Sequence, residues 1–260
     1  HTSDAHFYLG RIADERDEHQ RALAHYQQVE SGAHFFSALS RASYIRAETG
    51  ALVSVRENLE RLRAQMPDQQ ERIWLIEINL LLDRDEHDKA LEVSNKALED
   101  YPDNSNIRYT RAMLYERDGR IEEMEKDLRT ILEAEPDNAI ALNALGYTLT
   151  VHTERYDEAY EFVMRAYELA PDNPAIIDSV GWIYYKKGEL DKALKYLTEA
   201  YEALPDPEIA AHLGQVLWEK ERQDDARTVL HRALDEASDD ADVSPILDTL
   251  DELDLTPEEL

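Results

Sequence analysis

The apolar residues of this chain follow a helical period that stops and resumes at regular intervals. Within 174–206, four residues share one helix face at i, i+3, i+4 and i+7: Ile177, Val180, Gly181 and Tyr184. The Lys187-Gly188 pair then interrupts the pattern. A second helix follows, whose inner face is marked by Ala193, Leu197 and Ala200 and whose end is marked by Pro205. The segment therefore predicts two helices joined by a short turn.

This two-helix pattern recurs about every 34 residues, and a period of roughly 20 to 50 residues is typical of solenoid arrays. Its clearest marker is a glycine after leucine or valine: Gly10, Gly146, Gly181 and Gly214. Small residues follow at set distances, Ala22, Ala159, Ala193 and Ala226, and prolines close many units, Pro67, Pro102, Pro136, Pro171 and Pro205. We predict one continuous array over residues 1–260, with repeats at 3–35, 36–70, 71–104, 105–138, 139–173, 174–206 and 207–238 and a capping helix at 243–254.

Small residues are expected where the two helices of a repeat cross closely. Gly181 and Ala193 are the predicted points of contact, because a glycine inside a helix otherwise costs about 1 kcal/mol. Asp172, Asn173 and Pro174 offer an N-cap followed by a proline at the start of the next helix.

These positions resemble the tetratricopeptide repeat: Trp or Leu, then Leu-Gly, Tyr, Ala, Phe, Leu or Tyr, Ala and Pro at fixed offsets. The match is strong from 71 to 206, clear for 207–238, where Ser238 replaces the proline, and weaker before residue 71. Ser43 and Val55 stand where Gly and Ala are expected, and 139–173 carries an extra residue in its turn near Thr153. The resemblance implies an all-α fold of about 15 helices, a right-handed superhelix of helix pairs with no strand.

A closer resemblance rests on three segments, 143–149, 170–182 and 204–214. They are similar to proteobacterial tetratricopeptide outer-membrane lipoproteins, of which at least one is an adaptor that assembles and activates a periplasmic carboxyl-terminal processing protease. The resemblance implies that this chain is the C-terminal array of such a lipoprotein. It would then be periplasmic and anchored to the outer membrane in the full-length protein; a cytoplasmic location is the alternative.

The chain is strongly acidic, with a formal net charge of -29. Residues 1–70 hold 8 basic and 10 acidic side chains, whereas residues 235–260 hold 11 acidic and no basic ones. Such an excess of acid repels polyphosphate and anionic lipid, so neither a nucleic acid nor a membrane contact by this fragment is expected. There is no run of 18 apolar residues, no cysteine and no visible signal peptide, and the start at His1 suggests an excised fragment.

No motif for catalysis, cofactor binding or metal binding emerges from the sequence. The eight glycines are scattered, and the nine histidines form no ligand pair at helical spacing with a carboxylate in place. The Asp-rich segment 239–254 lacks the glycine and the final glutamate of a calcium loop. We therefore predict a non-enzymatic chain without cofactor or metal.

In such an array the first helix of each repeat lines the concave side, and the residues at offsets 2, 5, 9 and 12 face the groove. The offsets select a partner-binding groove formed by Tyr109, Met113, Asn143, Tyr147, Asp178, Trp182, Tyr185 and Trp218. Exposed aromatic residues are typical of recognition surfaces, and Asn143 and Asp178 could hydrogen-bond a peptide backbone. The alternative is that the rings pack against the second helix of the next repeat and close the groove. The Lys and Asn clamp for chaperone C-termini is absent, which argues against a C-terminal carboxylate as the ligand.

A second predicted interface lies in the weakly matching N-terminal repeats, where Phe35, Phe36, Leu39 and Tyr44 are close in sequence. These residues either pack on upstream repeats or contact a partner or a second copy of the chain. The resulting hypothesis is a scaffold that binds a protein or peptide, recruiting and activating a processing protease or presenting its substrates. The alternatives are a structural scaffold of the cell envelope or cytoplasm, and an interaction module of a larger enzyme.

Overall fold

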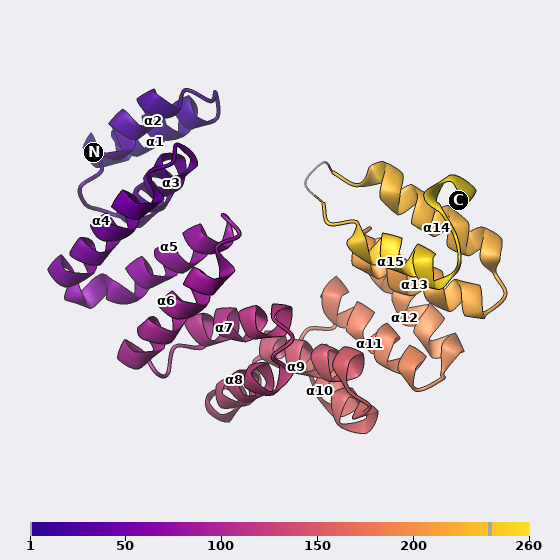
Figure 1. The fold of residues 1–260 in the computed structure, drawn as a ribbon. Helices are drawn as coiled ribbons and strands as arrows, with labels where there is room; N and C mark the ends of the chain where they lie inside the picture. Colours follow the sequence, from indigo (N-terminus) through magenta and orange to yellow (C-terminus); the bar gives the residue numbers. More distant parts are fainter. Residues whose placement is uncertain (1, 239–240) are drawn as a thin grey trace. The chain divides into compact units, whose positions relative to one another are not determined.

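The computed structural model describes residues 2–238 and 241–260, and this described part contains 15 α-helices, two short 3-10 helices and no strand. The all-helical fold expected from the sequence is thereby confirmed. The chain divides into two compact units, residues 1–114 and 115–260, each of which is described by itself. In both units, most helices that are neighbours in sequence lie side by side (Figure 1).

Unit 1 is built from three helix pairs and most of a seventh helix. Its elements are α1 (Thr2–Asp14), α2 (His19–Tyr26), α3 (Phe35–Glu48), α4 (Leu52–Gln65), η1 (Pro67–Gln69), α5 (Gln70–Leu82), α6 (His87–Asp100) and α7 (Ser105–Arg117) as far as Leu114. Its apolar clusters join neighbouring pairs: Trp74 of α5, Ala90 of α6 and Ile107 of α7 belong to one cluster. Each pair is therefore buried partly by the next pair, as expected of stacked repeats.

Unit 2 holds the end of α7 and eight further helices. Its elements are α8 (Ile121–Ala134), α9 (Ala139–His152), α10 (Tyr156–Leu169), α11 (Pro174–Lys186), α12 (Leu190–Ala203), α13 (Pro207–Glu219), α14 (Gln223–Glu236), α15 (Ser244–Glu252) and η2 (Pro257–Glu259). Residues 239–240, which begin the Asp-rich segment and precede the predicted capping helix, lie outside the described residues.

Side-chain caps start the first helices of the repeats in unit 2. The side-chain oxygens of Asn138, Asn173 and Asp206 accept backbone N–H groups of the following helix at 3.0, 3.0 and 2.9 Å. Pro174 and Pro207 occupy the first helical turn, where no backbone donor is needed. The start that the sequence predicted at Asn173 and Pro174 is confirmed.

In three repeats of unit 2, a glycine in the first helix lies in close contact with the second helix. A Cβ on Gly181 would lie 2.5 Å from Cγ of Leu197, and a Cβ on Gly214 would lie 2.8 Å from Cδ2 of Leu230. At Gly146 the obstacle includes backbone, because the carbonyl oxygen of Ala159 would be 3.0 Å away. The contact expected near Gly181 is real, but Leu197, one turn beyond Ala193, is the side chain that meets it.

Gly146→Ala should destabilise unit 2 by about 1–3 kcal/mol, because backbone atoms cannot yield to the added methyl group. Gly214→Ala is the control, since its obstacle is the flexible end of Leu230 and helix propensity returns about 1 kcal/mol. Urea denaturation followed by circular dichroism measures both changes. Equal effects of the two substitutions would show that helix contact at Gly146 is not the constraint.

The weakly matching repeat 36–70 is joined to the next repeat by a buried ion pair. Glu77 of α5 accepts hydrogen bonds from Arg56 and Arg63 of α4 at 2.8 and 2.6 Å, and its side chain is buried. The guanidinium of Arg63 also lies 3.7 Å from the ring centre of Trp74. A charged contact therefore joins this repeat to its neighbour. The repeat pattern of the sequence did not predict this contact.

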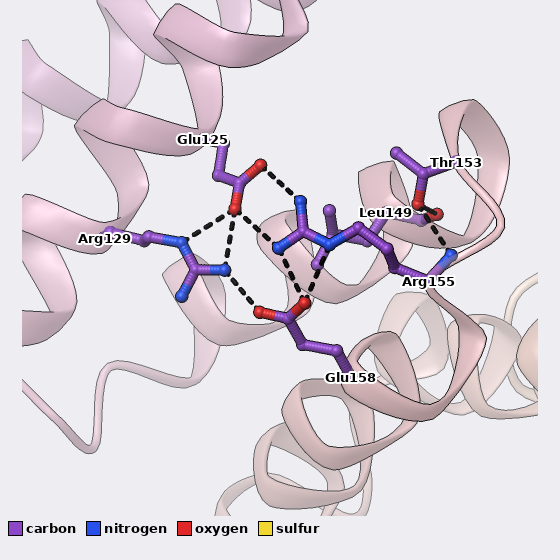
Figure 2. Close-up of polar contacts among 6 residues, drawn as sticks. All are labelled: Glu125, Arg129, Leu149, Thr153, Arg155 and Glu158. Carbon is purple, nitrogen blue, oxygen red and sulfur yellow. Dashed lines mark hydrogen bonds and ion pairs between the residues drawn. The ribbon is translucent and has the colours of Figure 1, made fainter.

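The long turn of repeat 139–173 leads into a four-residue ion network (Figure 2). The Thr153 hydroxyl donates to the Leu149 carbonyl at 2.6 Å and accepts the backbone N–H of Arg155 at 3.1 Å, which ends α9 and places Arg155. Arg155 donates to Glu125 of α8 and to Glu158 of α10 at 2.8 Å each.

Arg129 closes this network from the other side. It donates to Glu125 at 2.8 Å and to Glu158 at 2.5 Å, so each glutamate receives two arginines. The hydrogen bond from Arg155 lowers the pKa of Glu125, and the hydrogen bond from Arg129 lowers the pKa of Glu158, in both cases against burial. The network therefore joins two neighbouring repeats by carboxylates that are held ionised.

The stabilisation from this network should be complete above the ordinary glutamate pKa of about 4.3 and should be lost as pH falls through the lowered values of the folded state. Arg155→Met should cost about 1 kcal/mol at pH 7, because the pairs are partly exposed, and should flatten the fall of melting temperature between about pH 5 and 3. Arg61→Met on α4 is the control, since among the described residues the Arg61 side chain is bonded to Asn58 alone and to no carboxylate. If the melting temperature of the Arg155 variant fell with pH as steeply as that of the wild type, the network would not be the source of this pH dependence.

The C-terminal helix α15 packs on α13, with Ile246 and Leu250 buried. Leu247, directly after Ile246, is 42% exposed. One residue advances a helix by about 100°, so the buried stripe continues through Thr249 and not through Leu247. The Gln215 side chain also donates to Glu252 at 2.7 Å, which ties the end of α15 to α13.

Candidate functional site

The predicted groove residues are distributed over both units. Tyr109 and Met113 lie on α7 in unit 1 and are half-buried. The other six lie on the first helices of unit 2: Asn143 and Tyr147 on α9, Asp178, Trp182 and Tyr185 on α11, and Trp218 on α13. The structure therefore brings six of the eight onto neighbouring first helices of a single unit.

Trp182 is the centre of a stack of rings in unit 2. Its ring centre lies 4.7 Å from that of Tyr185 and 3.9 Å from that of His212, with interplanar angles of 22° and 19°. The Nζ atom of Lys186 sits 4.7 Å from the Trp182 ring centre. Trp182 is only 6% exposed, so it is a packing residue and not an exposed recognition residue. Its partner His212 lies on α13, the first helix of the next repeat, and not on the second helix that the packing alternative named.

A chain of polar groups runs beside this stack across three repeats. His212 Nδ1 lies 3.0 Å from both carboxylate oxygens of Asp178, and the two side chains are 8% and 4% exposed. His212 Nε2 lies 3.5 Å from the Tyr147 hydroxyl, which donates to Glu208 at 2.5 Å. Burial and the Glu208 carboxylate raise the pKa of Tyr147, so its hydroxyl stays a donor. Asp178 is thus occupied by His212 and is not free for a peptide backbone.

His212 was missed as a site residue by sequence reasoning, which found no histidine ligand pair. The signal was present in the repeat register: Asp178 stands three residues before Gly181, and His212 stands two before Gly214. Because first helices of consecutive repeats lie alongside each other, adjacent register positions meet across the interface. Comparing residues between repeats, instead of within one helix, would have made the two residues candidates for a contact that the tertiary structure then decides.

The remaining aromatic residues of this face also have partners in unit 2. The Tyr185 hydroxyl donates to Glu219 at 2.6 Å, and burial with this hydrogen bond raises the Tyr185 pKa. Trp218 is half-buried, with the Arg227 guanidinium 5.1 Å from its ring centre. Asn143 keeps a buried carbonyl oxygen without a hydrogen-bond partner among the described residues. Most polar and aromatic groups here are engaged within the fold, and partner binding by them stays a prediction.

Unit 1 contains an open cavity of about 800 Å³ between α3 and α5. It is lined by Ala33, Phe36, Ser37, Ser40, Arg41, Tyr44, Arg72, Leu75, Ile76 and Asp83. Two of the four aromatic and apolar residues predicted for an N-terminal interface, Phe36 and Tyr44, therefore face the same space. Phe35 and Leu39 line a separate cavity of about 330 Å³, so the predicted cluster is split between two sides of α3.

Each aromatic ring that lines the larger cavity has an arginine guanidinium near its face. The Arg72 guanidinium lies 5.0 Å from the Phe36 ring centre, and that of Arg41 lies 5.0 Å from the Tyr44 ring centre. Arg41 is also held by Asp14, to which it donates two hydrogen bonds at 2.5 and 3.0 Å. Burial raises the pKa of Asp14, but the hydrogen bonds and charge of Arg41 outweigh it and lower the pKa. Arg72 is exposed at the rim of the cavity.

The side chains that converge in the larger cavity are of the kinds that bind protein surfaces. Within residues 2–238 and 241–260, no group of three or more His, Asp or Glu side chains is arranged to hold a metal ion. A search of the same residues for a helix long and apolar enough to cross a membrane finds none. The cavity offers aromatic, aliphatic and guanidinium groups, which recognise protein surfaces.

Comparison with known families agrees with this helical architecture. Three tetratricopeptide-repeat families match residues 94–126, 137–206 and 181–241. The chain is a tetratricopeptide-repeat protein. Such proteins are protein-interaction scaffolds, and their fold typically carries no catalytic activity.

Relatives of this tetratricopeptide-repeat protein include a TPR repeat-containing protein of Pseudomonas aeruginosa, 44% identical over 211 residues. The match covers 81% of this chain and 36% of that protein, so the chain spans about a third of its relative's length. A TPR repeat-containing protein of Methanocaldococcus jannaschii is 29% identical over 143 residues, which cover 55% of this chain and 19% of the relative.

Solved structures share the fold at low sequence identity. A tetratricopeptide repeat protein from Parabacteroides merdae superposes with a TM-score of 0.69 at 14% identity, covering 95% of this chain and 98% of that one. A thermophilic TPR protein of Thermus thermophilus gives 0.61 at 22% identity, covering 71% and 100%. These likenesses establish the fold of the repeats.

Trp182→Ala should lower the stability of this repeat protein by about 3–5 kcal/mol, because it removes a buried ring from between two others. Trp218→Ala is the matched control and should cost less, since Trp218 is only half-buried. Chemical denaturation monitored by circular dichroism measures both. A loss below about 1 kcal/mol for Trp182→Ala would restore the alternative that this ring serves recognition.

Proposed function

We propose that this tetratricopeptide-repeat chain is a non-enzymatic adaptor that holds a protein partner in the cavity between α3 and α5. The observation that carries the proposal is the cavity of about 800 Å³ that Phe36, Tyr44, Leu75 and Arg72 help to line. Aromatic and arginine side chains in a concave site are the groups most often responsible for protein-binding energy. Unit 1 has 14 basic and 20 acidic side chains, whereas residues 115–260 have 14 basic and 37 acidic ones. Unit 1 therefore repels an acidic partner less strongly than unit 2 does.

The partner we propose is a periplasmic carboxyl-terminal processing protease, which the chain recruits and activates or to which it presents substrates. Support comes from the similarity of 143–149, 170–182 and 204–214 to outer-membrane lipoproteins of that adaptor class. A Pseudomonas relative that is 44% identical agrees with a proteobacterial source for this sequence type. A periplasmic location, with anchoring to the outer membrane in the full-length protein, belongs to the same proposal.

The proposal is tested with the double variant Phe36→Ala/Tyr44→Ala and the processing protease encoded in the same genome. Isothermal titration calorimetry should show a loss of affinity of about 2 kcal/mol or more, which is roughly thirtyfold, because both rings are cavity anchors. Stimulation of peptide cleavage by the protease should fall in parallel.

Val53→Ala is the control, because Val53 lies on α4 outside the cavity and is 73% exposed. Phe36 and Tyr44 also pack against the core of unit 1, so melting curves must show that the double variant remains folded at the assay temperature. Unchanged affinity in a folded double variant, or no binding of the protease by the wild type, would overturn the proposal.

A further inference from the structure

The cavity of unit 1 has different charges at its two ends. Arg72 is the third residue of α5 and Asp83 follows its last residue, and both line the cavity. At 1.5 Å per residue the two positions are about 16 Å apart along the helix. Within the described residues neither side chain forms an ion pair, although the Arg72 guanidinium lies over the Phe36 ring. Arg41, the other cation of the cavity, is already bound by Asp14.

The two walls of the cavity run in register. α3 and α5 are the first helices of consecutive repeats, and Phe36 near the start of α3 meets Arg72 near the start of α5. The start of a helix carries a partial positive charge and its end a partial negative charge. The helix dipole of α5 therefore acts in the same sense as Arg72 and Asp83, which makes one end of the cavity attractive to anions and the other to cations.

Apolar and hydroxyl groups lie between these ends. Leu75 and Ile76 of α5 form an apolar wall, and Ser37 and Ser40 of α3 expose hydroxyl groups on the other wall. A hydroxyl can donate to or accept from a peptide backbone. Along the cavity a cation is followed by an apolar wall and then by an anion. This spatial order fits an extended peptide segment better than a helix with a single apolar stripe.

We infer that the cavity binds an extended protein segment with an acidic residue, an apolar residue and a basic residue at positions i, i+2 and i+4. Alternate residues of an extended chain point to the same side and rise about 3.3 Å each, so these three span about 13 Å. The flexible side chains of Arg72 and of the bound basic residue cover the remaining distance. The acidic residue meets Arg72, the apolar residue meets Leu75 and Ile76, and the basic residue meets Asp83. The inference rests on the proposed function, because it names the chemistry of the segment that a partner would insert.

Fluorescence polarisation with labelled peptides and the full chain tests this inference. The wild type should bind a peptide with the core Glu-Thr-Leu-Thr-Lys about tenfold more tightly than one with Gln-Thr-Leu-Thr-Lys, since a charge-assisted pair with Arg72 is lost. Arg72→Glu should abolish that preference and should favour a Lys-Thr-Leu-Thr-Lys peptide instead. Arg61→Glu makes the same charge change on α4 outside the cavity and should behave like the wild type.

Gain of binding by the Arg72 variant to the doubly basic peptide cannot come from misfolding, so the test does not depend on loss of function alone. The inference is overturned if the wild type binds neither peptide, if it treats Glu and Gln alike, or if Arg72→Glu matches Arg61→Glu. Failure here together with a Phe36 and Tyr44 effect on protease binding would leave the proposed function standing. Peptide selectivity as expected, without any protease binding, would refute the proposed partner and retain the chemistry of the cavity.

Discussion

The close crossing of the two helices within a repeat is the contact on which the packing of unit 2 depends. A Cβ added at Gly146, Gly181 or Gly214 would lie 2.6, 2.5 or 2.8 Å from a side-chain atom of the second helix. The residues that fill this space, Val163, Leu197 and Leu230, are all buried aliphatic side chains. Because the crossing is fixed by van der Waals contact, the outer faces of the pair have a defined orientation, and the next pair can pack on them.

Polar contacts between consecutive repeats then add to this packing. In unit 2, Lys187 pairs with Asp157, and the equivalent Lys220 pairs with Asp191 one repeat later. The Tyr185 hydroxyl likewise donates a hydrogen bond to Glu219 of the next repeat. Since a repeat contacts mainly its neighbours, such pairs recur with the period of the sequence. They also use many of the few basic side chains of unit 2, which leaves its surface acidic.

The two units differ in what their first helices leave available. In unit 2 the aromatic residues stack on one another, and Trp182, His212 and Asp178 are buried in the interface between repeats. In unit 1 the equivalent space between α3 and α5 stays open, and Arg72 remains exposed at its rim. Rings that are committed to packing hold repeats together, whereas rings that face an open cavity can bind a partner. This difference is why the proposals concern unit 1.

The sequence alone determined the helical pairs, because helical periodicity, capping residues and the glycine positions are local properties. Asn173 and Pro174 start α11 as expected, and Gly181 lies at a helix crossing as expected. The offsets also identified the residues on the first-helix face. They could not separate buried from exposed residues on that face, because burial depends on which side chains the next repeat contributes.

Only the tertiary structure decided that His212 covers Trp182 and binds Asp178, since these residues are far apart in the sequence. The same holds for Glu77, whose two arginine partners come from the preceding helix, and for the separation of Phe35 from Phe36 and Tyr44. Helical periodicity describes one helix at a time. The open or closed state of a cavity is a property of two helices and of the side chains between them.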